Sequence, residues 1–339
     1  MKWLIWRQHR YEIIAMVLGA AFIAIGFVYG ADYVPRVRAE LGVDTCRPLP
    51  TTAANCALLS TQASDLAQPF RWLVLALFFV PAVVGAFIGG PLFARELERG
   101  THRLAWTQSI TRMRWSATKL LSILGVGFVA AALIASVGGR AGVINGVQAY
   151  GWEQTVSFSA LVAAASVVTS PFQTFDFEGP AFVGYVVFAI AIAAFVGTLS
   201  QRILIGVFAG LLLFGAVRLG VYELRPNYQP PLAVVYSAAT PTPQAELPAG
   251  AWVVRADYVD TEGRVVPPER VRALLNAYRP LPPQFDALAY MADNGALQRV
   301  QYQPAERYWR FQWTEGLLFF ALTIGFSAAA LMLLKRRDA

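Results

Sequence analysis

Six stretches of the chain are made almost entirely of apolar residues, each about 20 positions long. They are residues 12–30, 71–93, 116–138, 180–200, 203–222 and 313–334. A helix of this length can cross the roughly 30 Å of hydrocarbon in a lipid bilayer. The pattern therefore predicts a mainly α, polytopic membrane protein with six transmembrane helices.

The composition agrees with a chain that lies in a lipid bilayer. Of its 339 residues, 56% are hydrophobic and only 14% are charged. The net charge of +7 could indicate a nucleic-acid partner, but the cations occur in short blocks beside the apolar stretches rather than in one patch. We therefore expect no nucleic-acid partner.

Those basic blocks predict the orientation of the spans. They precede the first span, separate the second from the third and the fourth from the fifth, and follow the sixth in the tail 335–339. Short basic segments stay in the cytoplasm, whereas long segments cross the membrane largely regardless of charge. We therefore expect a plasma-membrane protein with both termini cytoplasmic and long outer connections at 31–70, 139–179 and 223–312.

Two apolar stretches leave alternatives open. The run at 12–30 follows a basic segment and could belong to a signal peptide, but it is long and no clean small-residue cleavage site follows it. Residues 156–170 form an apolar stretch interrupted by serine and threonine. This stretch is too short for an ordinary span, so we expect it to be interfacial, re-entrant or buried. If it crossed the membrane, the orientation of every later segment would be reversed.

The two cysteines support the orientation. Cys46 and Cys56 both lie in the predicted outer connection 31–70. A cysteine pair on the outer face is typical of a disulfide, which would close a ring of about 11 residues and contribute on the order of 3 kcal/mol in the chain-entropy model. Two free thiols are the alternative. We expect no metal site, because no histidine lies outside the predicted cytoplasmic segments.

The chain lacks the residues that several membrane enzymes and pumps require. Its three lysines do not follow the GxxxxGK[ST] pattern of a nucleotide-binding loop, and its two histidines form no HExxH. Apart from Glu12 at the entrance of a span, we expect no carboxylate within the spans, although proton-coupled carriers need such groups. We therefore predict no catalytic residue and no cofactor in this chain, so its energy must come from elsewhere.

The spans also contain features of helix packing. Gly85 and Gly89, like Gly206 and Gly210, are spaced for close helix approach. Arg218 lies about 15 residues into the fifth span, roughly 22 Å from its inner end. Its guanidinium could extend to the outer headgroups, or it could contact substrate or lipid.

The stretch "ELERGTHRLAWTQSITRMRW", residues 96–115, is polar between two apolar spans. Residues that favour helix continue the second span to Arg99, and Pro81 should kink it. A helix over 71–99 would be about 44 Å long and would protrude into the cytoplasm. Gly100 is suited to the left-handed cap that ends such a helix.

Residues 100–115, which we call the elbow, contain cues for two further helices. Thr101 can cap a short crosswise helix, and Ser109 or Thr111 can cap the helix that enters the third span. A solvated basic loop is one interpretation of the elbow. Its leucine and tryptophans among arginines are more typical of a protein interface. We therefore expect a partner to dock there.

Residues 223–312 predict a small α+β domain outside the membrane. The segment 251–260 resembles a strand, 261–264 a turn, and paired prolines begin helices in 267–278 and 282–295. This domain could shape a substrate exit, close over that exit, bind an extracellular peptide, or form a packed cap with no ligand. Aromatic side chains near the sixth span should form a belt at the outer headgroups, namely Tyr302, Tyr308, Trp309, Phe311 and Trp313.

Three segments of the chain together carry a resemblance to a known family. They are "FARELERGTHRLAWTQSITRMRW", "VRLGVYELRPNYQPP" and "YQPAERYWRFQWTEG". In sequence, order and spacing they resemble the permease subunits of actinobacterial ABC transporters of the type-2 exporter class. The resemblance implies a second permease copy, either identical or a close paralogue, and a pair of cytoplasmic ATPase subunits that bind ATP and Mg.

The same resemblance assigns roles to the cytoplasmic segments. Residues 1–11 would form an amphipathic helix along the inner leaflet, and the elbow would be the coupling helix that fits a cleft on the ATPase. The residues expected to contact the ATPase are Glu96, Glu98, Arg99, Thr101, Arg103, Trp106, Thr107 and Gln108. The predicted function is export of a hydrophobic or amphipathic drug, lipid or peptide. The alternative is a membrane-anchored sensor or immunity protein that does not transport.

Overall fold

The computed structural model describes residues 2–43, 53–101, 111–140, 170–236, 247–248, 250–277 and 287–336. The chain forms two compact units. The helical unit comprises Met1–Gln148, Gln173–Glu223 and Arg310–Ala339. The strand unit comprises Ala149–Phe172 and Leu224–Trp309.

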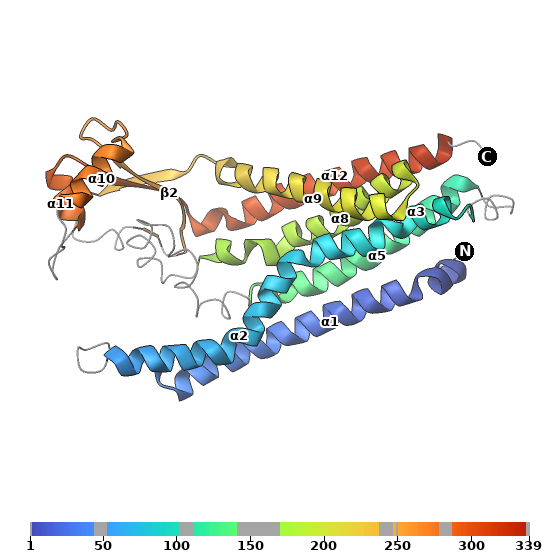
Figure 1. The fold of residues 1–339 in the computed structure, drawn as a ribbon, viewed down its shortest axis with the longest axis horizontal. Coiled ribbons are helices and arrows are strands. Elements are labelled where there is room, and N and C mark those ends of the chain that lie inside the picture. The colour runs from blue at the N-terminus through green and yellow to red at the C-terminus, as the bar shows by residue number, and fades with distance from the viewer. Residues whose placement is uncertain are drawn as a thin grey trace. The chain divides into compact units, whose positions relative to one another are not determined.

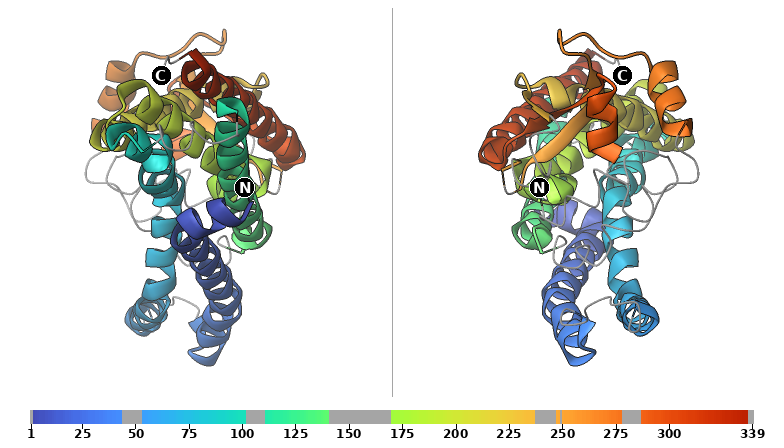
Figure 2. Two further views of the ribbon diagram at one scale, coloured as in Figure 1. Left: turned by 90° about the vertical axis from the view of Figure 1, so that its right-hand side faces the viewer. Right: turned by 90° about the vertical axis from the view of Figure 1, so that its left-hand side faces the viewer.

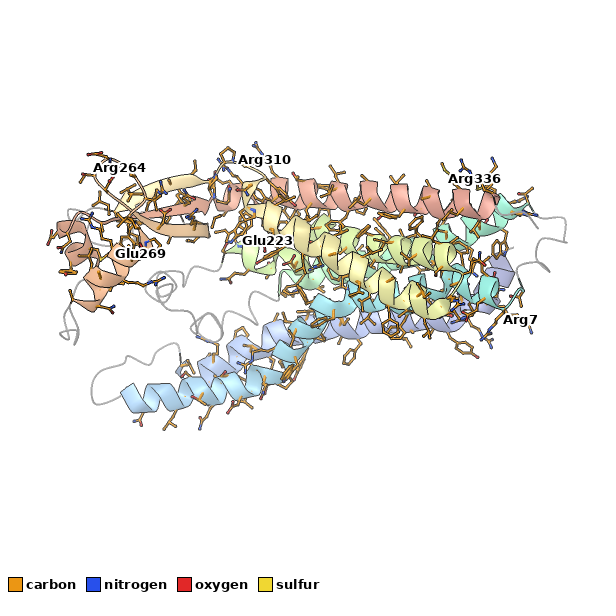
Figure 3. The ribbon with its side chains drawn as sticks, turned by 45° about the horizontal axis from the view of Figure 1, so that its top comes forward. Arg7, Glu223, Arg264, Glu269, Arg310 and Arg336 are labelled. Carbon is orange, nitrogen blue, oxygen red and sulfur yellow. The ribbon has the colours of Figure 1, made fainter. Side chains whose placement is uncertain are left out.

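Six helical stretches in the described part of the chain are long and apolar enough to cross a membrane. They are Trp6–Glu40, Leu58–Glu98, Arg112–Gly138, Pro171–Ser200, Ile203–Asn227 and Ala305–Arg336. Each contains one of the six predicted spans, so the prediction of six such helices is confirmed. Figure 3 shows Arg7 and Arg336 at one end of the helical unit and Glu223 and Arg310 at the other.

The first two helices are longer than predicted. Helix α1 (Lys2–Glu40) and helix α2 (Ala53–Val84) run side by side (Figure 1). The rings of Tyr29, Tyr33 and Phe70 cluster between them, with centroids 5.6 to 5.9 Å apart. Most of the predicted loop 31–70 is therefore a helical hairpin, and the loop prediction is wrong there. A helix needs no apolar sequence where it extends beyond the hydrocarbon of the bilayer. The apolar stretches alone therefore did not predict these extensions.

Helix α1 also includes most of the segment predicted as a separate amphipathic helix, residues 1–11. Helical structure begins at Lys2 and continues without interruption into the first span. Figure 2 shows the first turns bent away from the axis of the rest of α1. The segment is thus the bent start of α1, which corrects the predicted boundary.

Several predictions fall outside the described residues. Cys46 lies outside them, as does the side chain of Cys56 on α2, so the disulfide stays a prediction. The same holds for the apolar stretch 156–169 and for elbow residues 102–110. Helix α5 (Arg112–Gly138) begins after Thr111, one of the two predicted caps, whose side chain accepts a hydrogen bond from the Arg114 backbone N–H at 3.3 Å.

The second span is interrupted before it reaches the elbow. A π-helical turn, η2 (Gly85–Gly89), follows α2, and helix α3 (Pro91–Glu98) begins after Gly90. The predicted helix over 71–99 is therefore helical as far as Glu98, but it contains a π-helical turn that sequence analysis did not predict. Pro91 has no N–H for the helical hydrogen-bond ladder, but it suits the first turn of a new helix. Gly100 has φ +71°, the left-handed conformation predicted for the end of this helix.

Helix α8 (Gly179–Ser200) is buried along almost its whole length. The predicted glycine pairs pack against it. A Cβ atom on Gly89 would lie 2.6 Å from the Ile190 carbonyl oxygen, and one on Gly206 of helix α9 (Ile203–Leu224) would lie 2.9 Å from the Gly197 Cα. These glycines therefore bring backbones together within the chain.

The strand unit contains a three-stranded antiparallel sheet of order β1-β3-β2. Its strands are β1 (Leu232–Tyr236), β2 (Trp252–Val259) and β3 (Leu297–Gln303). Strand β2 and helices α10 (Pro268–Asn276) and α11 (Ala287–Asp293) agree with prediction. Tyr258, Val266, Met291 and Ala296 form a small core, which partly buried apolar residues cover.

Strand β3 was not predicted because polar residues occupy much of it. Its last residue, Gln303, is fully buried, and its amide donates to the carbonyls of Pro226 at 3.1 Å and Gln229 at 2.7 Å. Arg307 donates to the Gln303 side-chain oxygen at 2.8 Å and to the Pro230 carbonyl at 2.7 Å. Two segments that carried the family resemblance thus meet at Gln303.

The predicted aromatic belt is only partly exposed. Trp309 and Trp313, on or beside the first turns of helix α12 (Tyr308–Arg336), are more than half exposed. Tyr302, Tyr308 and Phe311 are buried. The belt prediction is therefore wrong for these three residues, which pack inside the protein.

Substitution of Gly197 by alanine should destabilise the helical unit, because the new Cβ would lie 2.4 Å from the Gly90 carbonyl oxygen. Forced separation of packed helices of this kind costs about 1–3 kcal/mol. The matched control is Gly215→Ala in α9, where nothing lies within 4 Å of the new atom. We expect G197A to lower the melting temperature in detergent and G215A to leave it unchanged or raise it. Equal effects would contradict the packing described here.

Candidate functional site at the base of the elbow

The residues predicted to contact an ATPase begin at the end of α3. Glu96 and Glu98 lie in the last turn of this helix, and Arg99 and Thr101 follow it. Arg99 and Thr101 are exposed. The remaining four predicted residues, Arg103, Trp106, Thr107 and Gln108, lie outside the described residues. The structure thus describes residues 96–101, which we call the base of the elbow, but not residues 102–110.

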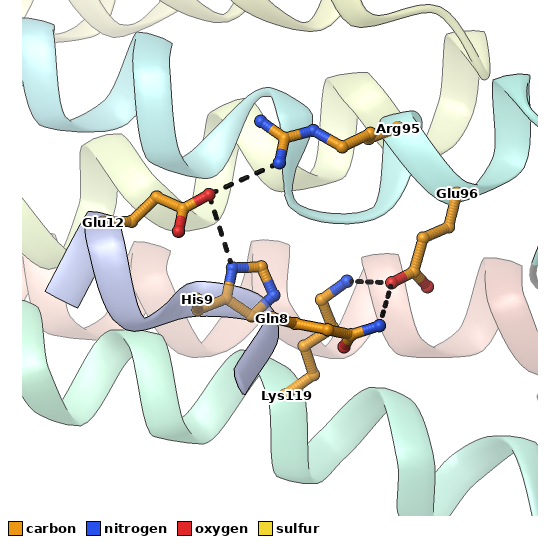
Figure 4. A network of polar contacts seen from close by, with 6 residues as sticks. All are labelled: Gln8, His9, Glu12, Arg95, Glu96 and Lys119. Atoms are coloured by element: carbon orange, nitrogen blue, oxygen red, sulfur yellow. Dashed lines mark hydrogen bonds and ion pairs between the residues drawn. The ribbon is translucent and has the colours of Figure 1, made fainter. Parts of the chain in front are cut away.

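Glu96 turns towards the interior of the helical unit (Figure 4). Its carboxylate forms an ion pair with the Lys119 ammonium of α5 at 2.8 Å and accepts a hydrogen bond from the Gln8 amide of α1 at 3.4 Å. The side chains of Glu96 and Lys119 are 15% and 2% exposed. Glu96 therefore joins three helices of this chain, and its contact with an ATPase stays a prediction.

Lys119 is surrounded by aromatic rings as well as by its carboxylate partner. Its ammonium lies 5.7 Å from the ring centre of Phe93 and 5.5 Å from that of Trp115. Aromatic faces attract cations, which helps to offset the cost of removing the ammonium from water. The sequence carried a sign of this role, because Lys119 lies inside the predicted span 116–138, where an unpaired lysine is costly.

A second group of charged side chains connects α1 to α3. Arg95 donates to the Glu12 carboxylate at 3.4 Å, and the His9 Nδ1 lies 3.8 Å from the same carboxylate (Figure 4). Glu12 and His9 both come from the first turns of α1. The start of the first span is thus held against the end of the second by side chains that sequence analysis did not pair.

Glu98 makes a different connection. Its Oε2 accepts a hydrogen bond of 2.9 Å from the backbone N–H of Ile203, the first residue of α9. The first N–H groups of a helix have no partner within the helix, and a carboxylate there also interacts favourably with the helix dipole. The end of α3 is therefore tied to α1, α5 and α9.

Arg218 does not extend to exposed headgroups. Its side chain is 11% exposed, and its guanidinium lies 3.5 Å from the Asp176 carboxylate of the 3₁₀ helix η4 (Pro171–Phe177). The guanidinium carbon is 4.0 Å from the ring centre of Tyr185 and 4.8 Å from that of Phe78. Its contact with substrate or lipid stays a prediction.

The same cluster corrects one expectation about the spans. Glu315, inside the predicted sixth span, is 1% exposed and accepts a hydrogen bond of 2.5 Å from the Tyr185 hydroxyl. The expectation that the spans hold no carboxylate beyond Glu12 is therefore wrong. The Tyr185 hydroxyl also lies 3.3 Å from Asp176. The Tyr185 hydroxyl thus gives the buried Glu315 carboxylate a hydrogen-bond partner, while Arg218 forms an ion pair with the partly exposed Asp176.

The class of protein follows from these features: it is a multi-pass helical membrane protein in which charged side chains hold the end of α3 to α1, α5 and α9. The family model described as "ABC-2 membrane transporter related" matches residues 14–225. The match covers more than half of the chain, which therefore belongs to this family. The protein is a membrane component of an ABC transporter and works with an ATPase subunit. No curated protein and no solved structure matches the chain.

Removal of the Lys119 ammonium alone should destabilise the protein more than removal of both charges. The variant Lys119→Met leaves the mostly buried Glu96 without its main partner, and breaking a buried pair in this way costs about 3–5 kcal/mol. We expect the double variant Glu96→Gln, Lys119→Met to recover part of that loss in denaturant unfolding in detergent.

The exposed pair Asp32–Arg36, whose side chains are 64% and 63% exposed, is the matched control. Its single and double neutral variants should change stability by less than about 1 kcal/mol. Strictly additive losses at Glu96 and Lys119 would show that the two charges do not act as a pair.

Proposed function

We propose that this chain is the transmembrane permease of an ATP-driven exporter. Its substrate would be a hydrophobic or amphipathic drug, lipid or peptide, moved outward with energy from a separate pair of ATPase subunits that bind ATP and Mg. Family membership supports the permease role and favours it over a sensor or immunity protein. One observation carries the proposal. At the base of the elbow, the exposed residues Arg99 and Thr101 follow a helix end that is bonded to α1, α5 and α9.

The contacts of Glu96 and Glu98 suggest how a movement of the ATPase would be transmitted to the permease. Glu96 is bonded to Lys119 of α5 and to Gln8 of α1, and Glu98 is bonded to the first N–H of α9. A push on the elbow would therefore displace the starts of three spans together. The π-helical turn Gly85–Gly89 separates α3 from α2, and such turns often occur at functional sites. We place the bend of the second span there.

The orientation follows from the same proposal. Arg7 of α1 and Arg336 of α12 lie at one end of the helical unit (Figure 3). Short basic segments favour the cytoplasmic side, so this end and both termini would be cytoplasmic. The strand unit would be extracellular. A second permease copy, identical or paralogous, would complete the transporter.

Replacement of Arg103 and Trp106 by alanine tests the coupling role of the elbow. The permease would be co-expressed with the ATPase subunit of its own transporter. Buried tryptophan and arginine contacts at interfaces often contribute 2 kcal/mol or more each, so we expect ATPase retention on the purified permease to fall by at least about tenfold. ATP hydrolysis that depends on the permease should fall in parallel.

The matched control is the double variant Arg310→Ala, Trp313→Ala. These two residues are exposed on α12, and Figure 3 shows Arg310 at the end of the helical unit opposite Arg7 and Arg336. The control removes the same residue types and should retain the ATPase. Unchanged retention and hydrolysis in the elbow variant would refute the coupling role.

A further inference from the structure

A cavity of about 280 Å³ lies beside the ion pairs at the base of the elbow. Its polar wall is formed by side chains of α1, α3 and α5 and by the residue that follows α3, namely His9, Glu12, Arg95, Glu96, Lys119 and Arg99. Its apolar wall includes Phe87, Ile88 and Leu92 from the end of the second span. All of these residues belong to the helical unit. The cavity therefore combines charged and apolar surface at one site.

The charges that line this cavity do not balance. Three fixed cations, Arg95, Arg99 and Lys119, face two carboxylates, Glu12 and Glu96. Lys119 pairs with Glu96 at 2.8 Å, and Arg95 lies 3.4 Å from Glu12. Arg99 has no ion pair with any residue that the structure describes. One positive charge is left over, so the cavity favours an anion.

His9 supplies an independent sign of a ligand. Its side chain is only 9% exposed, and its Nδ1 faces Glu12. Its Nε2 is buried and has no hydrogen-bond partner among the described residues. A buried polar atom without a partner costs about 1–3 kcal/mol, and such atoms in native proteins usually bind water, an ion or a ligand. Figure 4 shows the imidazole between Glu12 and the Lys119 side chain.

The position of the cavity favours a ligand with an apolar part. His9 and Glu12 flank the start of the first predicted span, and Arg95 and Arg99 follow the end of the second, which is the depth of phospholipid headgroups. Phe87 is 67% exposed and lies within the second predicted span. An acyl chain could therefore run along Phe87 and Ile88 while its headgroup reaches the charged wall.

We propose that this cavity binds the phosphate group of an anionic phospholipid. Arg99 donates charged hydrogen bonds to the phosphate. His9, in the tautomer that carries its proton on Nε2, donates a further one. The acyl chain covers Phe87 and Ile88. Inorganic phosphate offers the same headgroup chemistry but would leave the apolar wall uncovered. The bound lipid would bridge α1 and α3 at the base of the elbow.

The test uses the full-length permease purified without any ATPase, so a failure here leaves the coupling role untouched. Native mass spectrometry would follow titration with phosphatidylglycerol and, separately, with phosphatidylcholine. Loss of a charged hydrogen-bond donor costs about 1.5–3 kcal/mol, so Arg99→Gln should weaken phosphatidylglycerol binding at least about tenfold. Arg114→Gln is the matched control, because Arg114 is an exposed arginine of the elbow that does not line the cavity.

Two further arms identify the source of the phosphate and guard against misfolding. Phe87→Ala, at an exposed position, should weaken lipid binding without lowering the melting temperature, and excess inorganic phosphate should compete poorly. The proposal is overturned if R99Q binds phosphatidylglycerol as tightly as the unaltered protein, or if R114Q loses as much affinity. Full displacement by inorganic phosphate, with no effect of F87A, would assign the site to free phosphate and overturn the lipid proposal.

Discussion

The ion pair between Lys119 and Glu96 is the interaction on which the base of the elbow depends. The Lys119 side chain is only 2% exposed, so its ammonium needs a nearby carboxylate, and the 2.8 Å contact supplies it. This requirement fixes the last turn of α3 against α5, while Gln8 adds α1 to the same carboxylate. The direction of α3 in turn places Glu98 at the first N–H of α9. A single buried charge thus sets the positions of several helix ends.

The opposite end of the helical unit follows the same principle with different groups. Arg218 of α9 lies beside Asp176 and two aromatic rings, and Tyr185 of α8 binds Glu315 of α12. Between these polar ends, glycines let η2 and α9 approach the backbone of α8. The helical unit is therefore held by charged contacts near both ends and by close backbone packing in between. The charges restrict which helices can pair, and the glycines set their separation.

Local sequence patterns were sufficient for part of this structure. The six apolar stretches, the cap at Thr111 and the left-handed Gly100 depend on nearby residues, and all were predicted correctly. The π-helical turn, strand β3 and the inward direction of Glu96 depend on partners far along the chain. Glu96 and Lys119 are separated by 23 positions, and Gln303 and Pro226 by 77. No local periodicity reports such pairings, so sequence analysis assigned Glu96 and Glu98 to contact with an ATPase and not to contacts within the chain.

We propose that the base of the elbow moves with α1 as one body and bends relative to α2. Double electron–electron resonance can test it with spin labels at Thr101 and Arg10, and at Thr101 and Val83, after both native cysteines are replaced by serine. Each pair would be measured with the ATPase free of nucleotide and trapped with ATP. The account predicts an unchanged distance between Thr101 and Arg10 and a changed distance between Thr101 and Val83. A changed distance between Thr101 and Arg10 would contradict it.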